Sequence, residues 1–119
     1  MADLPVAQAD AGLNAMFAPA TTYYLSLHTA DPGTTGANEV TGGSYARQAI
    51  TFSSASNGSQ TSTNAQTFTN MPAVTLAGTG IWSTATAGNY LGGGPATSTA
   101  IPAGATVQYS AGDVSNTLS

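Results

Sequence analysis

Apolar and polar residues alternate along most of this chain in short runs, and turn residues separate the runs. In residues 23–28 every second side chain is a large apolar one, which predicts a strand with one buried face. Residues 45–52 alternate in the same way, and Asn57-Gly58 predicts a tight hairpin because both residues tolerate positive φ angles. Further strands are expected at 61–69, 73–76, 80–84, 89–91, 105–110 and 113–118.

The short strands and frequent turns predict an all-β fold, a small antiparallel β-sandwich of the jelly-roll type or a small barrel. Gly78, Gly88 and the glycine run at 92–94 are interpreted as breaks between strands. A βαβ arrangement is excluded because no helical run lies between the strands. A solenoid is not expected because the sequence has no repeat of fixed period.

Residues 1–18 differ from the rest because they are rich in Ala and poor in turn residues. Between Asp10 and Pro19 the apolar side chains follow the i, i+3, i+4 spacing of one face of a short helix. We therefore expect an N-terminal arm with a short helix (1–18), followed by a β-sandwich domain (19–119). Exposed apolar side chains on so short a segment need a partner surface, so the candidate interface residues are Leu4, Val6, Leu13, Met16 and Phe17.

Composition narrows the possible functions. The 119 residues include no Cys, only 5% are charged, and the net charge is −4. Disulfide scaffolds, zinc fingers and cysteine nucleophiles are thereby excluded, and no basic patch exists for nucleic acid or anionic membranes. No apolar run is long enough to span a membrane, and the N-terminus lacks a secretion signal, so the chain is expected in the cytoplasm of the producing cell.

Few side chains are candidates for chemistry. His28 is the only imidazole, and Asp31 follows it across a turn, which is more typical of a local hydrogen bond than of a catalytic pair. Asp31, Asn38 and Glu39 offer oxygen ligands in one loop, but without the Asp-x-Asp-x-Asp-Gly spacing of a calcium loop. We expect no catalytic residues, no metal and no cofactor, and therefore no enzyme.

Two further residues have alternative interpretations. Arg47, the only Arg in a chain without Lys, is a further candidate interface residue. We expect it to stack on an aromatic ring or to pair with Glu39 or Asp31, in the fold or at a subunit interface, and favour this over a role in ligand binding. Trp82 is a sugar platform in one interpretation and a core anchor in the other, which we favour. The candidate core anchors are Trp82, Leu25, Leu27, Ile50 and Phe52.

The stretch SLHTADPGTTGANEVTGGSYARQAI, residues 26–50, is long and distinctive. It resembles a group of small virion proteins of tailed bacteriophages that are described as tail fibre, minor tail or capsid-associated proteins. The resemblance extends more weakly to Gly80-Ile81-Trp82 and to residues 111–113, and it is lost between 51 and 76. It implies a structural protein of the virion.

Among virion proteins, the chain's thin core and neutral surface favour a capsid decoration protein of the minor capsid or cement type. It would bind the outside of the major capsid lattice as a homo-oligomer, expected to be a trimer, and would stabilise that lattice by mass action. Its partners would be the major capsid protein, or tail proteins, and itself, with no nucleic acid and no membrane. The alternative is a minor tail or tail-fibre component that contacts the host receptor through Trp82, Asn89 or Tyr90.

Overall fold

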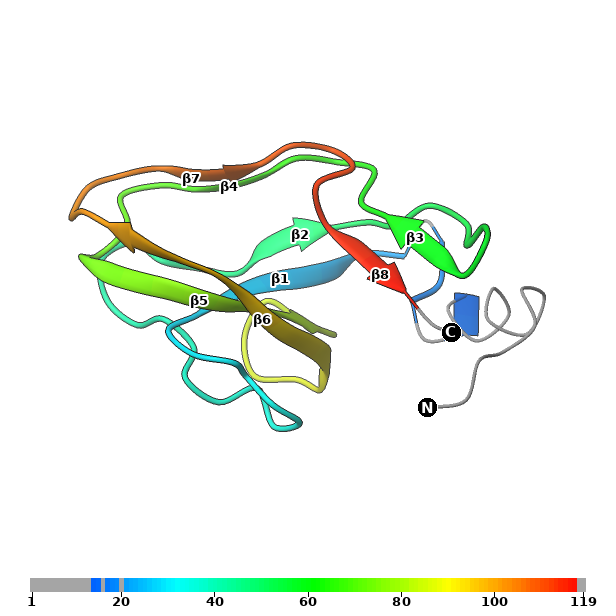
Figure 1. Cartoon of the computed structure of the whole chain (residues 1–119), viewed down its shortest axis with the longest axis horizontal. Coiled ribbons are helices and arrows are strands. Elements are labelled where there is room, and N and C mark those ends of the chain that lie inside the picture. The colour runs from blue at the N-terminus through cyan, green and yellow to red at the C-terminus, as the bar shows by residue number, and fades with distance from the viewer. Residues whose placement is uncertain (1–13, 16, 20, 118–119) are drawn as a thin grey trace. The chain divides into compact units, whose positions relative to one another are not determined.

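The computed structural model describes residues 14–15, 17–19 and 21–117 (Figure 1). All regular elements in this part of the chain are strands, and the strand pairs of known direction are antiparallel, so the protein is all-β. The described residues contain no helix that is long and apolar enough to cross a membrane. The strands are β1 (Tyr23–His28), β2 (Gln48–Ile50), β3 (Ser59–Thr61), β4 (Gln66–Phe68), β5 (Val74–Trp82), β6 (Tyr90–Ile101), β7 (Val107–Tyr109) and β8 (Ser115–Thr117).

The chain divides into two compact units. One consists of residues 23–49 and 66–108, and the other of 50–65, 109–119 and the segment up to 22. The larger unit carries most of a four-stranded sheet in the order β2-β1-β5-β6, together with the pair β4-β7, whereas β3-β8 belongs to the smaller unit. Figure 1 shows β1, β5 and β6 running side by side.

The four-stranded sheet shows why several turn predictions fail. The predicted strands 73–76 and 80–84 form one continuous strand, β5, with Gly78 inside it, and the glycine run 92–94 lies inside β6. A Cβ on Gly78 would lie 2.6 Å from the carbonyl oxygen of Ala30, and one on Gly80 would lie 2.8 Å from Ser26 Oγ. Glycine therefore marks the close approach of other groups here and not the end of a strand.

Other boundaries also differ from the prediction. The strand predicted at 45–52 is reduced to β2, and the one at 61–69 is divided into β3 and β4. The Asn57-Gly58 turn is confirmed, with φ of 54° and 74° at the two residues and hydrogen bonds in both directions between Ser56 and Ser59. Strand β1 has the predicted bounds.

The N-terminal helix is not supported. Most of the segment 1–18 lies outside the described residues, and within the described part only Asn14 and Ala15 have helical backbone. Phe17, expected at an exposed interface, is only 6% exposed, and its ring lies 5.6 Å from that of Phe52. The Gln60 side chain donates a hydrogen bond of 2.7 Å to the Phe17 carbonyl, so this residue belongs to the core of the smaller unit.

Candidate functional site

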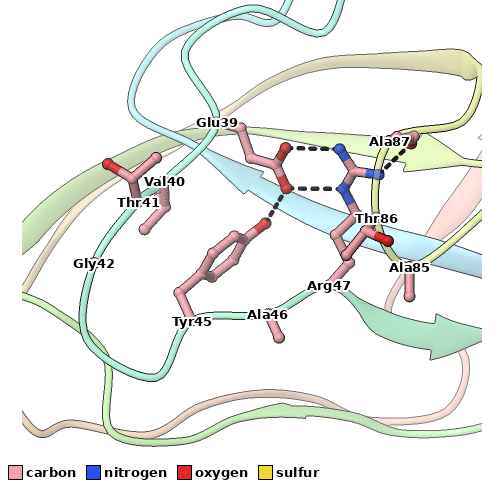
Figure 2. Close-up of a pocket in the computed structure, with 10 residues that line it drawn as sticks. All are labelled: Glu39, Val40, Thr41, Gly42, Tyr45, Ala46, Arg47, Ala85, Thr86 and Ala87. Carbon is pink, nitrogen blue, oxygen red and sulfur yellow. Dashed lines mark hydrogen bonds and ion pairs between the residues drawn. The ribbon is translucent and has the colours of Figure 1, made fainter.

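Two charged residues of the larger unit, Arg47 and Glu39, form a cluster with Tyr45. Arg47 donates from Nε and Nη2 to the two carboxylate oxygens of Glu39, each over 2.9 Å, and the Tyr45 hydroxyl donates to the same carboxylate over 2.7 Å (Figure 2). The Tyr45 oxygen in turn accepts the backbone N–H of Leu27 in β1. A paired guanidinium and carboxylate fix both distance and orientation, which a single point charge does not.

On its other side, the Arg47 guanidinium binds the hairpin loop of residues 83–89, which connects β5 to β6. Arg47 Nη1 donates to the carbonyl of Thr84 over 3.2 Å and to that of Ala87 over 2.8 Å. Its central carbon lies 3.7 Å from the centre of the Trp82 ring, a cation–π contact. Four of the five guanidinium N–H donors are thus used within the larger unit.

A second polar chain lies against β5. Trp82 Nε1 donates to Ser26 Oγ over 2.9 Å, Ser26 Oγ is 2.6 Å from His28 Nε2, and His28 Nδ1 is 2.7 Å from the Ala37 carbonyl. Because that carbonyl only accepts, Nδ1 carries the proton, Nε2 accepts, and the Ser26 hydroxyl donates to it. With a neutral imidazole, every donor and acceptor in this series of hydrogen bonds therefore has a partner. Ser26 and His28 are both 0% exposed, so no solute reaches them in this conformation.

In the ion-pair cluster and the neighbouring hydrogen-bond series, the surroundings shift the pKa values of three groups. Burial lowers the pKa of His28, against smaller raising effects from the Ala37 carbonyl and Glu39. For Glu39, burial raises the pKa, but the hydrogen bonds from Arg47 and Tyr45 and the charge of Arg47 prevail, so the net pKa is lowered. The pKa of Tyr45 is raised, chiefly by burial. At neutral pH Arg47 and Glu39 thus form an ion pair, while the nearby His28 imidazole and Tyr45 phenol are neutral.

A pocket of about 400 Å³ adjoins the ion pair (Figure 2). The pocket is lined by loop residues 39–42, by Tyr45–Arg47 and by hairpin residues 85–87. Its charged groups already bind one another, and its hairpin side is formed by small Ala and Thr side chains. No group of three or more metal-ligating side chains occurs in the part of the chain that the structure describes.

The structure places the predicted chemical residues as follows. Of the two partners considered for Arg47, Glu39 is the one used, and the expected aromatic stacking is on Trp82. His28 does not hydrogen-bond to Asp31, whose carboxylate instead accepts the N–H of Gly33 in a local turn. The residues considered as calcium ligands do not act together, because both carboxylate oxygens of Glu39 already accept hydrogen bonds from Arg47.

The candidate core residues are all in or near the core. Leu25, Leu27 and Ile50 are 0% exposed and Phe52 is 1% exposed. Trp82 is half-buried, with one ring face under Arg47, so that face is closed to a sugar, and its ring makes a T-shaped contact with Tyr90. Of the candidate interface residues, Leu4, Val6, Leu13 and Met16 lie outside the described residues.

Sequence reasoning missed the roles of Ser26 and Tyr45 and the carbonyls of the 83–89 hairpin loop. A backbone carbonyl leaves no trace in a sequence, and Ser is common throughout this chain. The close alternation of Ser26 and His28 on one strand was the available indication, since residues two apart point to the same face.

Together, fold and site define a small all-β protein whose buried polar groups fasten its loops to a sheet. The family model described as podophage GP4 fiber I protein gp80 matches residues 7–117. The chain therefore belongs to this family, a family of structural fibre proteins of phage virions. A comparison with curated proteins gave no match. The family description favours the tail-fibre alternative over capsid decoration, the interpretation preferred from the sequence.

Proposed function

We propose that this protein is a structural component of the tail fibre of a tailed bacteriophage, exposed on the virion, and that it acts by non-covalent contact and not by catalysis. The observation that carries the proposal is the fibre-family match, which spans residues 7–117. Its partners would be further copies of itself, expected as a trimer, and neighbouring virion proteins, without nucleic acid or membrane.

The Arg47 cluster supports a contact role for the hairpin loop 83–89. Residues 84–89 are exposed, yet the loop is fixed by the two carbonyl bonds to Arg47 and by the bond from the Asn89 N–H to Ser83 Oγ. A loop that is ordered before binding loses less conformational entropy when a partner binds. The contact between Ser26 and His28 is enclosed, which is consistent with a structural role for those two residues.

For the larger unit we propose a small β-sandwich. The sheet β2-β1-β5-β6 and the pair β4-β7 would be its two layers. Tyr45 and Phe68 support this arrangement, because their rings stack nearly parallel, 6° apart, with centres separated by 5.9 Å. Phe68 is contributed by β4, and the Tyr45 hydroxyl reaches β1.

Fractionation of phage particles tests the location. Virions are separated into heads and tails, and each fraction is probed with an antibody to the purified chain, with gold-labelled antibody applied to intact particles as a second measurement. We expect the protein in the tail fraction, labelling at the fibres, and a few copies per particle. Hundreds of copies on the heads would refute the fibre proposal and restore capsid decoration.

A further inference from the structure

The loop of residues 29–38 follows β1 and lies against the buried side chain of His28. Within this loop only Pro32 and Gly36 are buried, and the other residues are exposed. Loop 29–38 therefore packs on the sheet through two residues, and its attachment otherwise depends on hydrogen bonds.

Two side chains bind the backbone of loop 29–38. His28 Nδ1 donates to the Ala37 carbonyl over 2.7 Å, and the Tyr90 hydroxyl, on β6, donates to the Gly33 carbonyl over 3.1 Å. Surface segments with few buried contacts open at a lower free-energy cost than the core strands beneath them. Loop 29–38 is thus able to open while the sheet stays folded.

The loop and two aromatic rings close the space around His28. A Cβ on Gly36 would lie 2.6 Å from the Trp82 ring and 2.9 Å from the Tyr90 ring. A Cβ on Gly80 would lie 2.9 Å from both His28 Nε2 and the Tyr90 ring. Because the imidazole is 0% exposed, water reaches it only when these contacts separate.

The closed arrangement has no place for a second proton on His28. In the neutral form the Ser26 hydroxyl donates to Nε2, the one acceptor that this hydroxyl has among the described residues. In the protonated form Nε2 and Trp82 Nε1 would both donate to Ser26 Oγ, and the hydroxyl proton would have no acceptor. A buried charge and a buried donor without a partner both disfavour the closed loop, whereas entering water would satisfy both.

Ionisable side chains around His28 come from the segment between β1 and β2 and from β6. They are Asp31, Glu39, Tyr45, Arg47 and Tyr90. Arg47 is a permanent cation, and the lowered pKa of Glu39 keeps this carboxylate ionised above pH 5. The raised pKa values of Tyr45 and Tyr90 keep both phenols neutral, and β5 has no ionisable side chain. Of the buried and half-buried groups, only His28 therefore changes charge between pH 7 and 5.

We propose that protonation of His28 opens loop 29–38, which thereby acts as an acid-sensitive lid on the sheet. The loop is then a fixed surface at neutral pH and a mobile one in mild acid. The proposal concerns the isolated chain and does not depend on the fibre assignment.

Proton linkage gives the size of the response. In the open loop the imidazole is in water and has its ordinary pKa of 6.5, whereas burial lowers the pKa in the closed loop. Opening is therefore favoured as pH falls below 6.5. If the closed loop binds no proton, the ratio of open to closed molecules rises by about 25-fold between pH 7 and pH 5.

Hydrogen exchange of the Trp82 indole N–H measures the opening, because this group donates to Ser26 Oγ and the chain has one Trp. Exchange rates corrected for the intrinsic effect of pH should show a 10- to 25-fold larger opening constant at pH 5 than at pH 7. The backbone N–H of Met71, which is buried and bonded to the Ala105 carbonyl, reports on unfolding of the whole larger unit. Its opening constant should be at least tenfold smaller at both pH values. Equal constants for the two groups, or no increase at pH 5, would overturn the proposal.

Two variants separate the proton from the other attachment of the loop. Gln in His28→Gln has one donor and one acceptor like the neutral imidazole but binds no proton, so the indole opening constant should be the same at pH 7 and pH 5. Tyr90→Phe removes the hydroxyl bond to Gly33 and should raise opening by about 2- to 10-fold at both pH values. Tyr24→Phe, the control, removes a half-buried hydroxyl of β1 and should leave opening unchanged. A full pH response in His28→Gln, or equal effects of the two Tyr variants, would refute the lid.

The wild-type protein provides a measurement that needs no variant to fold. His28 is the only His, so its two ring nitrogens give a single pair of ¹⁵N signals. At pH 7 these should show a protonated Nδ1 and an unprotonated Nε2, as the bonds to Ala37 and Ser26 require. A proton on Nε2 at pH 7 would contradict the proposal, because the closed loop would then already accommodate it.

Discussion

Replacing Arg47 by Ala tests how strongly the cluster stabilises the larger unit. The change removes two bonds to Glu39, two to hairpin carbonyls and the stacking on Trp82, and it leaves a carboxylate without its cation. Breaking a buried ion pair costs about 3–5 kcal/mol, and breaking an exposed one costs about 0–1 kcal/mol. The side chains of Arg47 and Glu39 are 9% and 22% exposed, which places this pair nearer the buried case.

We therefore expect Arg47→Ala to lower the free energy of unfolding by about 3 kcal/mol, a large part of the 5–15 kcal/mol typical of a small domain. Arg47→Lys should lose about half as much, because an ammonium group satisfies one carboxylate oxygen but not the carbonyls of Thr84 and Ala87 as well. Urea unfolding followed by the fluorescence of Trp82, the only Trp, measures the loss in the unit concerned.

A double-mutant cycle with Glu39→Gln isolates the ion pair from the other contacts of Arg47. We expect a coupling free energy of about 1–3 kcal/mol that changes little between low salt and 1 M NaCl, since the pair is mostly shielded from solvent. A loss below about 1 kcal/mol for Arg47→Ala, or a coupling that salt abolishes, would show that the pair behaves as a surface ion pair. Arg47 would then not be the residue that fixes the hairpin loop 83–89.

Three further predictions concern single positions. Gly36→Ala should destabilise the protein by about 2–4 kcal/mol and Gly33→Ala by only about 1–2 kcal/mol. Both residues have positive φ, but only at Gly36 would a Cβ meet the Trp82 ring, at 2.6 Å. Equal losses of stability for the two variants in urea unfolding would refute the close contact. Because the pKa of His28 is lowered on folding, stability is complete above its ordinary pKa of 6.5 and falls as pH drops below it, by up to about 1.4 kcal/mol per pH unit. His28→Gln should flatten that decline of stability between pH 7 and 5. This window lies above the ordinary pKa of Glu39, 4.5, and the contribution of Glu39 to stability is lost only at lower pH. An unchanged slope in the variant would contradict the assignment of the decline to His28. Phe17→Ala should lower stability by about 3–5 kcal/mol, so removal of residues 1–18 should unfold the smaller unit, and a deletion variant of unchanged melting temperature would show that Phe17 is dispensable.

Local sequence determined those features that depend on a residue and its near neighbours. The alternation at 23–28 set the bounds of strand β1, and Asn57-Gly58 formed its turn because few other residue pairs adopt positive φ at low energy. The all-β class followed from the same short-range patterns. The virion family followed from the long distinctive stretch of residues 26–50, because a likeness between sequences depends on the order of residues and not on their contacts.

The roles of residues that meet distant parts of the chain were decided only by the tertiary structure. Gly78 looks like a break in the sequence, but it lies inside β5 because Ala30 and Pro32 pack over it. Glycine permits both a turn and a close approach, and local sequence does not distinguish the two.

Arg47 shows the same limit from the side of a functional group. Its choice of Glu39, of Trp82 and of two hairpin carbonyls joins residues 8 to 40 positions apart. The sequence restricted the possible partners, because so few charged residues exist, and Glu39 was among them. Which groups it meets, and that it thereby holds an exposed loop in place, follows from how the sheet brings distant segments together, since packing and not sequence separation sets those distances.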